Sequence, residues 1–297
     1  MKRFMIGQYG NFDQNKQIRD FRKDFFGVEA CMMKEESCIK KITDVAFNED
    51  FKISIHFPLR ADSGRLRDPQ FLSMDESIRK DSYEYMNSEI NFLKEIKPHY
   101  VLMHYPKPVI LDNSVDWTNW RFANDTEYYF EDEISFEHFS EKSEELFEWF
   151  SDISVKNDFI PVLEFDALNR YIYDSDFLEN LLEKYPRIKL CLDIGRLHLQ
   201  DRLDDNFDSF EVTKRFSKYA EVVHLWNVKV NSNLEHSHFP ALPHLKPEDG
   251  WADVERYLRI INGSNKSYKV LFEHRSDLIT DLELEACYNW INNILSE

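Results

Sequence analysis

Glycine is scarce in this chain, at 7 of 297 residues. The turn after the first apolar run reads Gln8-Tyr-Gly-Asn-Phe-Asp13 and lacks a G-x-G-x-x-G pattern, so the sequence disfavours a dinucleotide-binding scaffold. Cysteine is also rare: the four cysteines form no C-x-x-C pair, and Cys191 lies inside an apolar run. This distribution predicts reduced thiols.

Basic residues are outnumbered, with 37 Lys and Arg against 55 Asp and Glu and a formal net charge of −18. Affinity for phosphate backbones and anionic membranes depends on Lys and Arg, so we expect neither nucleic acid nor a membrane as a partner. No apolar run approaches the roughly 18 residues of a membrane span, and the first residues, Met-Lys-Arg-Phe-Met-Ile-Gly-Gln, lack the apolar stretch of a signal peptide. We therefore expect a cytoplasmic protein.

Six short apolar runs, by contrast, end in a residue that can bind a metal ion or transfer a proton. They are Lys52–His56, Tyr100–His104, Ile160–Glu164, Lys189–Asp193, Glu221–His224 and Lys269–Glu273. Continuous apolar runs are typical of buried parallel strands, whose carboxyl ends converge on one mouth in a closed barrel. The sequence therefore predicts three histidines and three carboxylates in one pocket.

Strand and helix patterns alternate along the whole chain. Helices are expected near residues 14–24, 36–48, 75–96, 136–156, 175–185, 208–218, 250–262 and 279–295. Ser73-Met-Asp-Glu76 is typical of a capping box at the start of the third helix. Eight strands and eight helices predict a (β/α)8 barrel, here one domain over residues 1–297 with an insertion at about 105–134. An open doubly wound sheet is the alternative, but such a sheet binds its ligand at one switch point, so its site would not draw residues from six strands.

Four of the strand ends form the strongest candidate site: Glu164, Asp193, His224 and Glu273. Three ionised carboxylates crowd together only around a positive charge, and this ligand set suits a divalent cation such as Mn²⁺ or Mg²⁺. The alternative is that each residue makes a separate local hydrogen bond or salt bridge. His56 and His104 would face the same mouth. They are candidates for ligands of further metal ions or for hydrogen-bond donors to substrate, and the alternative is that they are structural residues.

The quartet, in order and strand position, resembles the metal site of the xylose-isomerase-like superfamily. Asp193 stands in Leu-Asp-Ile-Gly195, His224 in Val-His-Leu-Trp-Asn227 and Glu273 in Leu-Phe-Glu273, while Asp249-Gly-Trp-Ala-Asp253 resembles the family's Gly-Glu-Gly-x-Ile-Asp segment. The resemblance spans the chain. It implies a TIM barrel, a divalent metal ion and the chemistry of sugar-phosphate isomerases, ketose 3-epimerases or the endonuclease IV-type AP endonucleases.

The resemblance also suggests roles for further residues. If this chain works as the ketose epimerases that it resembles, Glu164 and Glu273 would be the catalytic acid and base on opposite faces of an enediolate. Arg196 stands where relatives commonly carry a histidine, and His198 follows two residues later. His236 stands where the endonucleases carry an aspartate ligand, whereas His238 matches one of their histidine positions. These changes weaken the zinc-dependent hydrolase alternative. His56, His104, Arg196 and Lys107 are candidates for binding hydroxyl groups or a phosphate; the alternative for Lys107 and Arg196 is that they are ordinary solvated charges.

We thus expect an enzyme, a sugar or sugar-phosphate isomerase or epimerase with a carbohydrate substrate. A zinc-dependent phosphodiesterase and a ligand-binding barrel without catalysis stay open as alternatives. The insertion is rich in aromatic residues, among them Trp117 and Trp120. Long loops at a barrel mouth commonly act as lids, so these tryptophans are candidate lid residues; packing onto the barrel or a homo-oligomer contact is the alternative.

Overall fold

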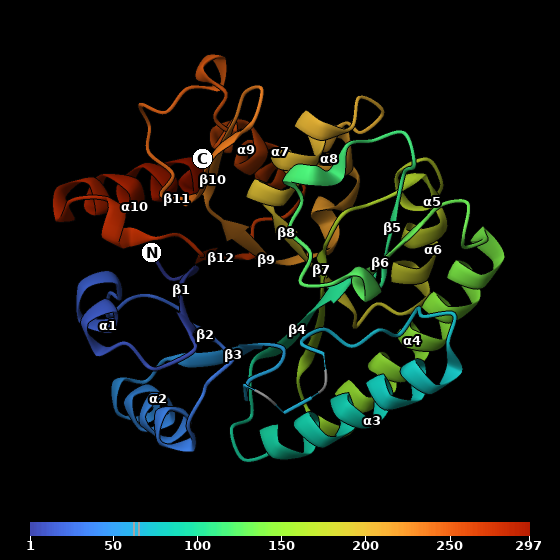
Figure 1. The fold of residues 1–297 in the computed structure, drawn as a ribbon. Coiled ribbons are helices and arrows are strands. Elements are labelled where there is room, and N and C mark those ends of the chain that lie inside the picture. Colours follow the sequence, from blue (N-terminus) through green and yellow to red (C-terminus); the bar gives the residue numbers. More distant parts are fainter. Residues whose placement is uncertain (62, 65) are drawn as a thin grey trace.

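The computed structural model describes residues 1–61, 63–64 and 66–297. Within them, eight parallel strands close into a barrel in the order β1-β12-β9-β8-β7-β4-β3-β2 (Figure 1). These strands are β1 (Phe4–Tyr9), β2 (Gly27–Cys31), β3 (Lys52–His56), β4 (Tyr100–Tyr105), β7 (Ile160–Phe165), β8 (Lys189–Asp193), β9 (Ala220–Leu225) and β12 (Lys269–Phe272). The predicted (β/α)8 barrel is confirmed.

Strand register pairs candidate residues on two pairs of neighbouring strands. His104 pairs with Glu164 between β4 and β7, and Asp193 pairs with His224 between β8 and β9. Below these pairs, a buried apolar layer fills the barrel: Met5, Tyr100, Leu102, Val162, Cys191, Val222 and Leu271. Because side chains alternate across a strand, the residues two positions further along each strand point into the same interior, at the carboxyl end.

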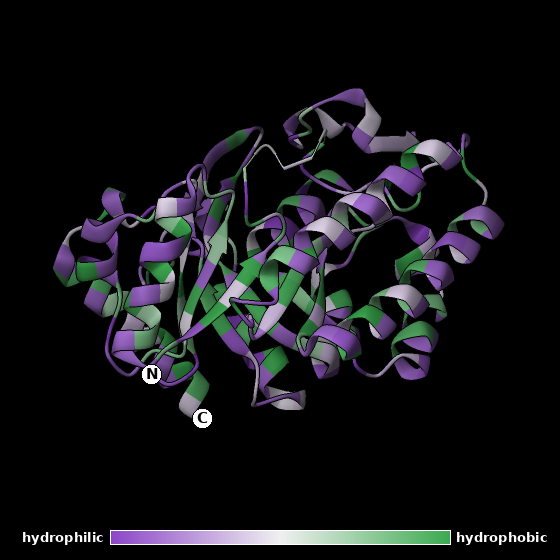
Figure 2. Ribbon diagram, turned by 90° about the horizontal axis from the view of Figure 1, so that it is seen from below, coloured by the Kyte–Doolittle hydropathy of each residue, from purple (hydrophilic) through white to green (hydrophobic). Residues whose placement is uncertain are grey.

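The helices surround this barrel, as Figures 1 and 2 show, and the apolar residues concentrate in the strands and along the helix faces that cover them. They are α1 (Gln14–Asp20), α2 (Glu36–Glu49), α3 (Glu76–Leu93), α4 (Phe136–Asn157), α5 (Arg170–Tyr173), α6 (Phe177–Lys184), α7 (Ile194–Leu203), α8 (Ser209–Phe216), α9 (Val254–Ser264) and α10 (Asp281–Ser296). In the described part of the chain, no helix is long and apolar enough to cross a membrane. The four cysteines are free, as expected.

Two local predictions were wrong. The capping box at Ser73 does not form, because Asp75 is the N-cap of α3 and accepts from the backbone N–H groups of Ser77 and Ile78. No helix was expected directly after Asp193, yet α7 begins at Ile194. Asp193 is both the last residue of β8 and the N-cap of α7, where its side chain accepts from the backbone N–H of Arg196.

The two long loops at the barrel mouth carry small sheets of their own. The insertion after β4 contains β5 (Val109–Leu111) paired with β6 (Tyr128–Phe130), and two 3₁₀ turns, η1 (Trp117–Asn119) and η2 (Asp125–Glu127). After β9, β10 (Asn227–Val230) pairs with β11 (Leu234–Phe239) as an antiparallel hairpin. Both loops therefore add ordered walls beside the candidate site.

Candidate functional site

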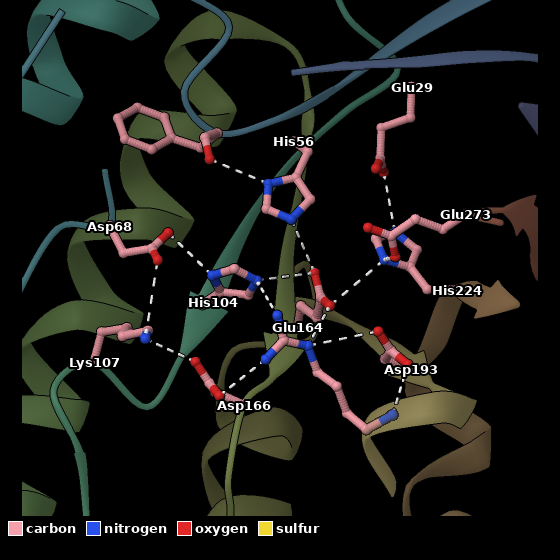
Figure 3. A network of polar contacts seen from close by, with 12 residues as sticks. Glu29, His56, Asp68, His104, Lys107, Glu164, Asp166, Asp193, His224 and Glu273 are labelled. Atoms are coloured by element: carbon pink, nitrogen blue, oxygen red, sulfur yellow. Dashed lines mark hydrogen bonds and ion pairs between the residues drawn. The ribbon is translucent and has the colours of Figure 1, made fainter. Parts of the chain in front are cut away.

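The predicted residues converge at the carboxyl ends of the strands, as Figure 3 shows. Glu164, Asp193, His224 and Glu273 each offer one side-chain oxygen or nitrogen atom, and these four atoms all lie within 4.8 Å of one another. Two overlapping groups satisfy the same condition: His56, His104 and Glu164, and Glu164, Cys191 and His224. Glu164 belongs to all three groups. It is therefore the centre of the cluster.

Glu164 is buried and surrounded by imidazoles. Its Oε2 lies 3.1 Å from His56 Nε2 and 3.6 Å from His104 Nε2, and its Oε1 lies 3.5 Å from His224 Nδ1. Burial alone would raise the pKa of Glu164, but the charges of the neighbouring His224 and His104, and then the closeness of His224 and His56, hold that pKa well below its usual range. The carboxylate is consequently ionised and available to a cation.

Each of the three histidines is held at its far nitrogen. His56 Nδ1 lies 3.1 Å from the carbonyl oxygen of Phe57, and His104 Nδ1 lies 3.0 Å from Asp68 Oδ1. His224 Nε2 lies 3.3 Å from Glu29 Oε2, so its Nδ1 faces the carboxylates. An acceptor at the far nitrogen fixes the tautomer of a metal-binding histidine and leaves the near lone pair free. All three rings turn the other nitrogen toward Glu164.

Asp193 is held in the cluster from two sides. The Trp226 indole N–H donates to its Oδ2 over 3.0 Å, and the Arg196 backbone N–H donates to its Oδ1 over 2.9 Å. Burial, and then the charges of Glu164 and Glu273, raise the pKa of Asp193 to about 7. Gly195 is required here, because a Cβ at this position would lie 2.3 Å from the Trp226 ring.

Arg196 places a fixed positive charge beside the quartet. Its Nε lies 3.5 Å from Glu164 Oε1 and 3.6 Å from Asp193 Oδ2, and its Nη1 lies 3.1 Å from Asp166 Oδ1. Its Nη2 lies 3.3 Å from His104 Nε2. Arg196 is thus not a solvated surface charge. Its side chain is 27% exposed and that of Glu273 is 35% exposed, whereas Glu164 is 1% exposed. The cluster is therefore open to solvent beside Arg196 and Glu273.

Lys107 also differs from a solvated charge. Its side chain is 4% exposed, and its Nζ lies 2.8 Å from Asp166 Oδ2, 3.6 Å from Glu127 Oε2 and 3.9 Å from Asp68 Oδ2. The Lys107 amine therefore forms ion pairs with these three carboxylates. Lys107, Asp166 and Arg196 form a continuous chain of alternating charge from the insertion to Glu164. Figure 3 shows the contact of Lys107 with Asp166 in this chain.

The remaining histidines lie outside the metal-capable groups found among the described residues. His236 is exposed and stacks on Trp251 at 5.4 Å between ring centroids. His238 stacks on Trp226 at 4.2 Å. The pKa of His198 is lowered by burial, and its ring interacts with the backbone of Gly250. The structure therefore leaves these three predicted residues outside the metal-capable groups, although His238 lies near enough to Glu273 for their charges to interact.

Both candidate lid tryptophans are buried in the insertion. The Trp117 indole N–H donates to the Asp112 carbonyl over 3.0 Å, and the Trp120 indole N–H donates to Asp166 Oδ1 over 3.0 Å. Their rings pack edge to face, with centroids 5.8 Å apart. In this conformation they anchor the loop onto the barrel, and their role as a lid stays a prediction.

Three carboxylates of the site were not predicted from the sequence. Asp166 lies two residues after Glu164, on the same side of the chain, and this spacing could have revealed it. Glu29 interrupts the apolar run of β2, which is an unusual place for a charge. Asp68 lies in the loop after β3 and follows no periodic pattern.

The contact between Glu29 and His224 can be tested for its effect on metal binding. It is 4% exposed, accepts from the Tyr100 hydroxyl over 2.6 Å and lies 3.3 Å from His224 Nε2. Glu29→Gln should weaken divalent-metal binding about 10–100-fold, because the imidazole loses its charged partner. A titration of Mn²⁺ against a competing chelator measures this. Tyr100→Phe keeps the carboxylate and should have a smaller effect; equal metal affinity in Glu29→Gln and the unaltered protein would refute the role.

Comparison with known proteins locates the fold. Neither the family models nor the curated protein sequences give a match to this chain. Solved structures do. A D-tagatose 3-epimerase-like protein matches with a TM-score of 0.62 and 14% identity, covering 100% of this chain and 98% of that one. The IolI protein with a bound zinc atom matches with a TM-score of 0.59 and 13% identity, covering 98% of each chain.

An AP endonuclease, family 2, from Brucella melitensis also matches, with a TM-score of 0.55, 13% identity and coverage of 96% of this chain and 97% of that one. TM-scores of 0.62, 0.59 and 0.55 show a shared fold, and identities of 13–14% show no more than the fold. The closed barrel, its strand order and these neighbours agree with the resemblance seen in the sequence. The chain is a (β/α)8 barrel of the xylose isomerase-like fold.

Proposed function

We propose that this protein is a divalent-metal-dependent isomerase or epimerase acting on a sugar or sugar phosphate. The observation that carries the proposal is the group Glu164, Asp193, His224 and Glu273, whose ligand atoms lie within 4.8 Å of one another. The similarity of the fold to that of a D-tagatose 3-epimerase-like protein supports a sugar as the substrate.

The residues fit a divalent cation. Glu164 Oε2 and His224 Nδ1 are buried atoms without a hydrogen-bond partner among the described residues, although His56 and Glu273 lie near them. Buried polar atoms normally have partners, and a cation between these two atoms would supply one to each. Carboxylate oxygens with one imidazole suit Mn²⁺, Mg²⁺ or Zn²⁺. When bound, such a cation supplies the positive charge that stabilises an enediolate.

The chain's own side chains would carry the proton transfer. Glu164 and Glu273 come from β7 and from the end of β12, with β8 and β9 between them in the barrel. This separation around the mouth suits one carboxylate removing a C–H proton and the other returning it. Glu273 is the more exposed of the two, so substrate would enter beside it and beside Arg196, whose guanidinium can donate to substrate oxygens.

The reaction can be tested by exchange of substrate hydrogen with solvent. Ketoses and ketose phosphates are incubated with the protein in D₂O with Mn²⁺, Mg²⁺ or Zn²⁺, and deuterium uptake at carbon is followed by NMR. We expect uptake next to the carbonyl of at least one ketose, accompanied by the epimer or aldose. Glu273→Gln should slow it about 10²–10⁴-fold, the usual contribution of a general acid or base. Absence of uptake from every ketose with every metal ion would refute the proposal.

A phosphodiesterase is the second candidate, and one observation favours it. His56, His104 and Glu164 form a further metal-capable group that shares Glu164 with the quartet, and two metal ions with a bridging ligand are typical of phosphoester hydrolases. Against it, Arg196 replaces a ligand histidine, and the net charge of −18 opposes DNA binding. Cleavage of abasic DNA or of bis(p-nitrophenyl) phosphate with Zn²⁺, without ketose exchange, would favour this candidate.

A further inference from the structure

A cavity of about 400 Å³ lies beside the charged cluster but outside it. The loop after β3, helix α3 and the η2–β6 part of the insertion form its walls. Among the described residues, Asp68 lines this cavity and also contacts His104 and Lys107. The volume falls in the range of about 300–1,000 Å³ that is usual for small-ligand sites.

The inner wall contains one buried, unpaired hydrogen-bond acceptor. Gln70 is 1% exposed; its Nε2 donates to the Asp68 carbonyl over 2.7 Å, and its backbone N–H donates to Ser82 Oγ over 2.8 Å. Its Oε1, in contrast, is buried and has no hydrogen-bond partner among the described residues. A buried amide oxygen left unpaired is costly, so a donor that reached it from a ligand would be favourable.

The other walls are aromatic and acidic. Tyr85 and Tyr129 line the cavity, and burial raises the pKa of Tyr85 to about 12, so its hydroxyl stays protonated. Asp81 and Asp125 lie at the exposed rim. The described lining residues include no Lys, Arg or His. At these described residues a phosphate would meet carboxylates, whereas a group rich in O–H donors would meet carboxylates and aromatic surface.

We propose that this cavity binds a neutral, hydroxyl-rich ligand such as a sugar ring, at a site separate from the proposed reaction centre. Hydroxyl groups would donate to Gln70 Oε1 and to the rim carboxylates, while the tyrosine rings cover the apolar face of the ring. The occupant would also lie against Asp68, whose carboxylate fixes the His104 ring. The proposal depends neither on a bound metal ion nor on turnover.

The test measures sugar binding without catalysis. Saturation-transfer NMR is recorded on EDTA-treated full-length protein with the methyl α-glycosides of glucose, mannose and galactose as probes, and with glucose 6-phosphate and glucosamine as charged comparisons. We expect at least one methyl glycoside to bind better than either charged sugar. Gln70→Leu removes the unpaired acceptor and should raise the dissociation constant about tenfold or more.

Further variants locate the bound probe. Ile78→Trp, from α3, would fill the cavity and should abolish binding, whereas Glu84→Gln on the exposed side of α3 should not change it. Circular dichroism identifies any variant that fails to fold. If Ile78→Trp does not fold, the effect of Gln70→Leu on glycoside binding decides the test. Glu164→Gln should bind the glycoside normally. The proposal would be overturned if Glu164→Gln lost binding or if Gln70→Leu kept it unchanged. It would also be overturned if the protein preferred glucose 6-phosphate or glucosamine, or bound no methyl glycoside. These outcomes do not depend on the result of the ketose assay.

Discussion

Glu164→Gln is expected to lower turnover in the ketose assay about 10²–10⁴-fold, the contribution of a general acid or base, and to reduce metal retention as well. Glu164 is common to all three metal-capable groups found among the described residues, and three imidazoles surround it. Gln keeps the shape of the side chain but loses its charge and one acceptor oxygen. The measurements are the rate of deuterium uptake at saturating Mn²⁺ and the metal content of the purified variant.

Glu221→Gln is the matched control for this change. Glu221 also contacts a histidine, with 3.0 Å between its Oε1 and His99 Nε2, but it lies near the amino end of β9. Its loss should leave deuterium uptake and metal content unchanged. If Glu164→Gln retained the activity and metal content of the unaltered protein, the assigned site would be wrong.

Lys107→Met is expected to lower the free energy of unfolding by about 3–5 kcal/mol, as the removal of one member of a buried ion pair commonly does. Lys107 is 4% exposed and contacts Asp166, Asp68 and Glu127. Burial lowers the pKa of Lys107, but the charges of Asp166 and Asp68 outweigh this and leave the pKa above its usual value. Met fills the space of the aliphatic stem and leaves the carboxylates without their cation.

Urea unfolding followed by circular dichroism measures this loss as a lower midpoint at unchanged slope. The control is Lys214→Met on α8, because Lys214 is 70% exposed and its contact with Glu211 is a surface pair. That variant should keep the original midpoint. Equal midpoints for Lys107→Met and the unaltered protein would show that the buried charge chain contributes nothing to stability.

The barrel and its quartet could be predicted because both follow from local patterns. A buried parallel strand is a continuous apolar run, and a polar residue at its end is conspicuous: His104, Glu164 and Asp193 each close such a run. Helix α7 was missed because it follows Asp193 without any intervening loop, and the same side chain ends the strand and caps the helix. Sequence patterns separate elements by their loops, so this junction gave no signal.

The charges around the quartet were harder to predict, since they depend on contacts between distant segments. Lys107 resembles any solvated lysine in the sequence, yet carboxylates from three different loops enclose it. Asp68 fixes His104 across 36 positions of the chain. His238 matched a family histidine position in sequence and His236 stood in place of an aspartate ligand, and in the structure the two rings stack on Trp226 and Trp251. Tertiary geometry, not spacing, decided these cases.

The most direct test of the metal site is the metal content of gently purified protein, measured by elemental mass spectrometry beside a Glu164→Ala, Asp193→Ala double variant. We expect about one manganese, magnesium or similar divalent ion per chain in the unaltered protein, and its loss in the double variant. No metal after incubation with Mn²⁺, Mg²⁺ and Zn²⁺, or the same content in both proteins, would contradict a cation site at the quartet.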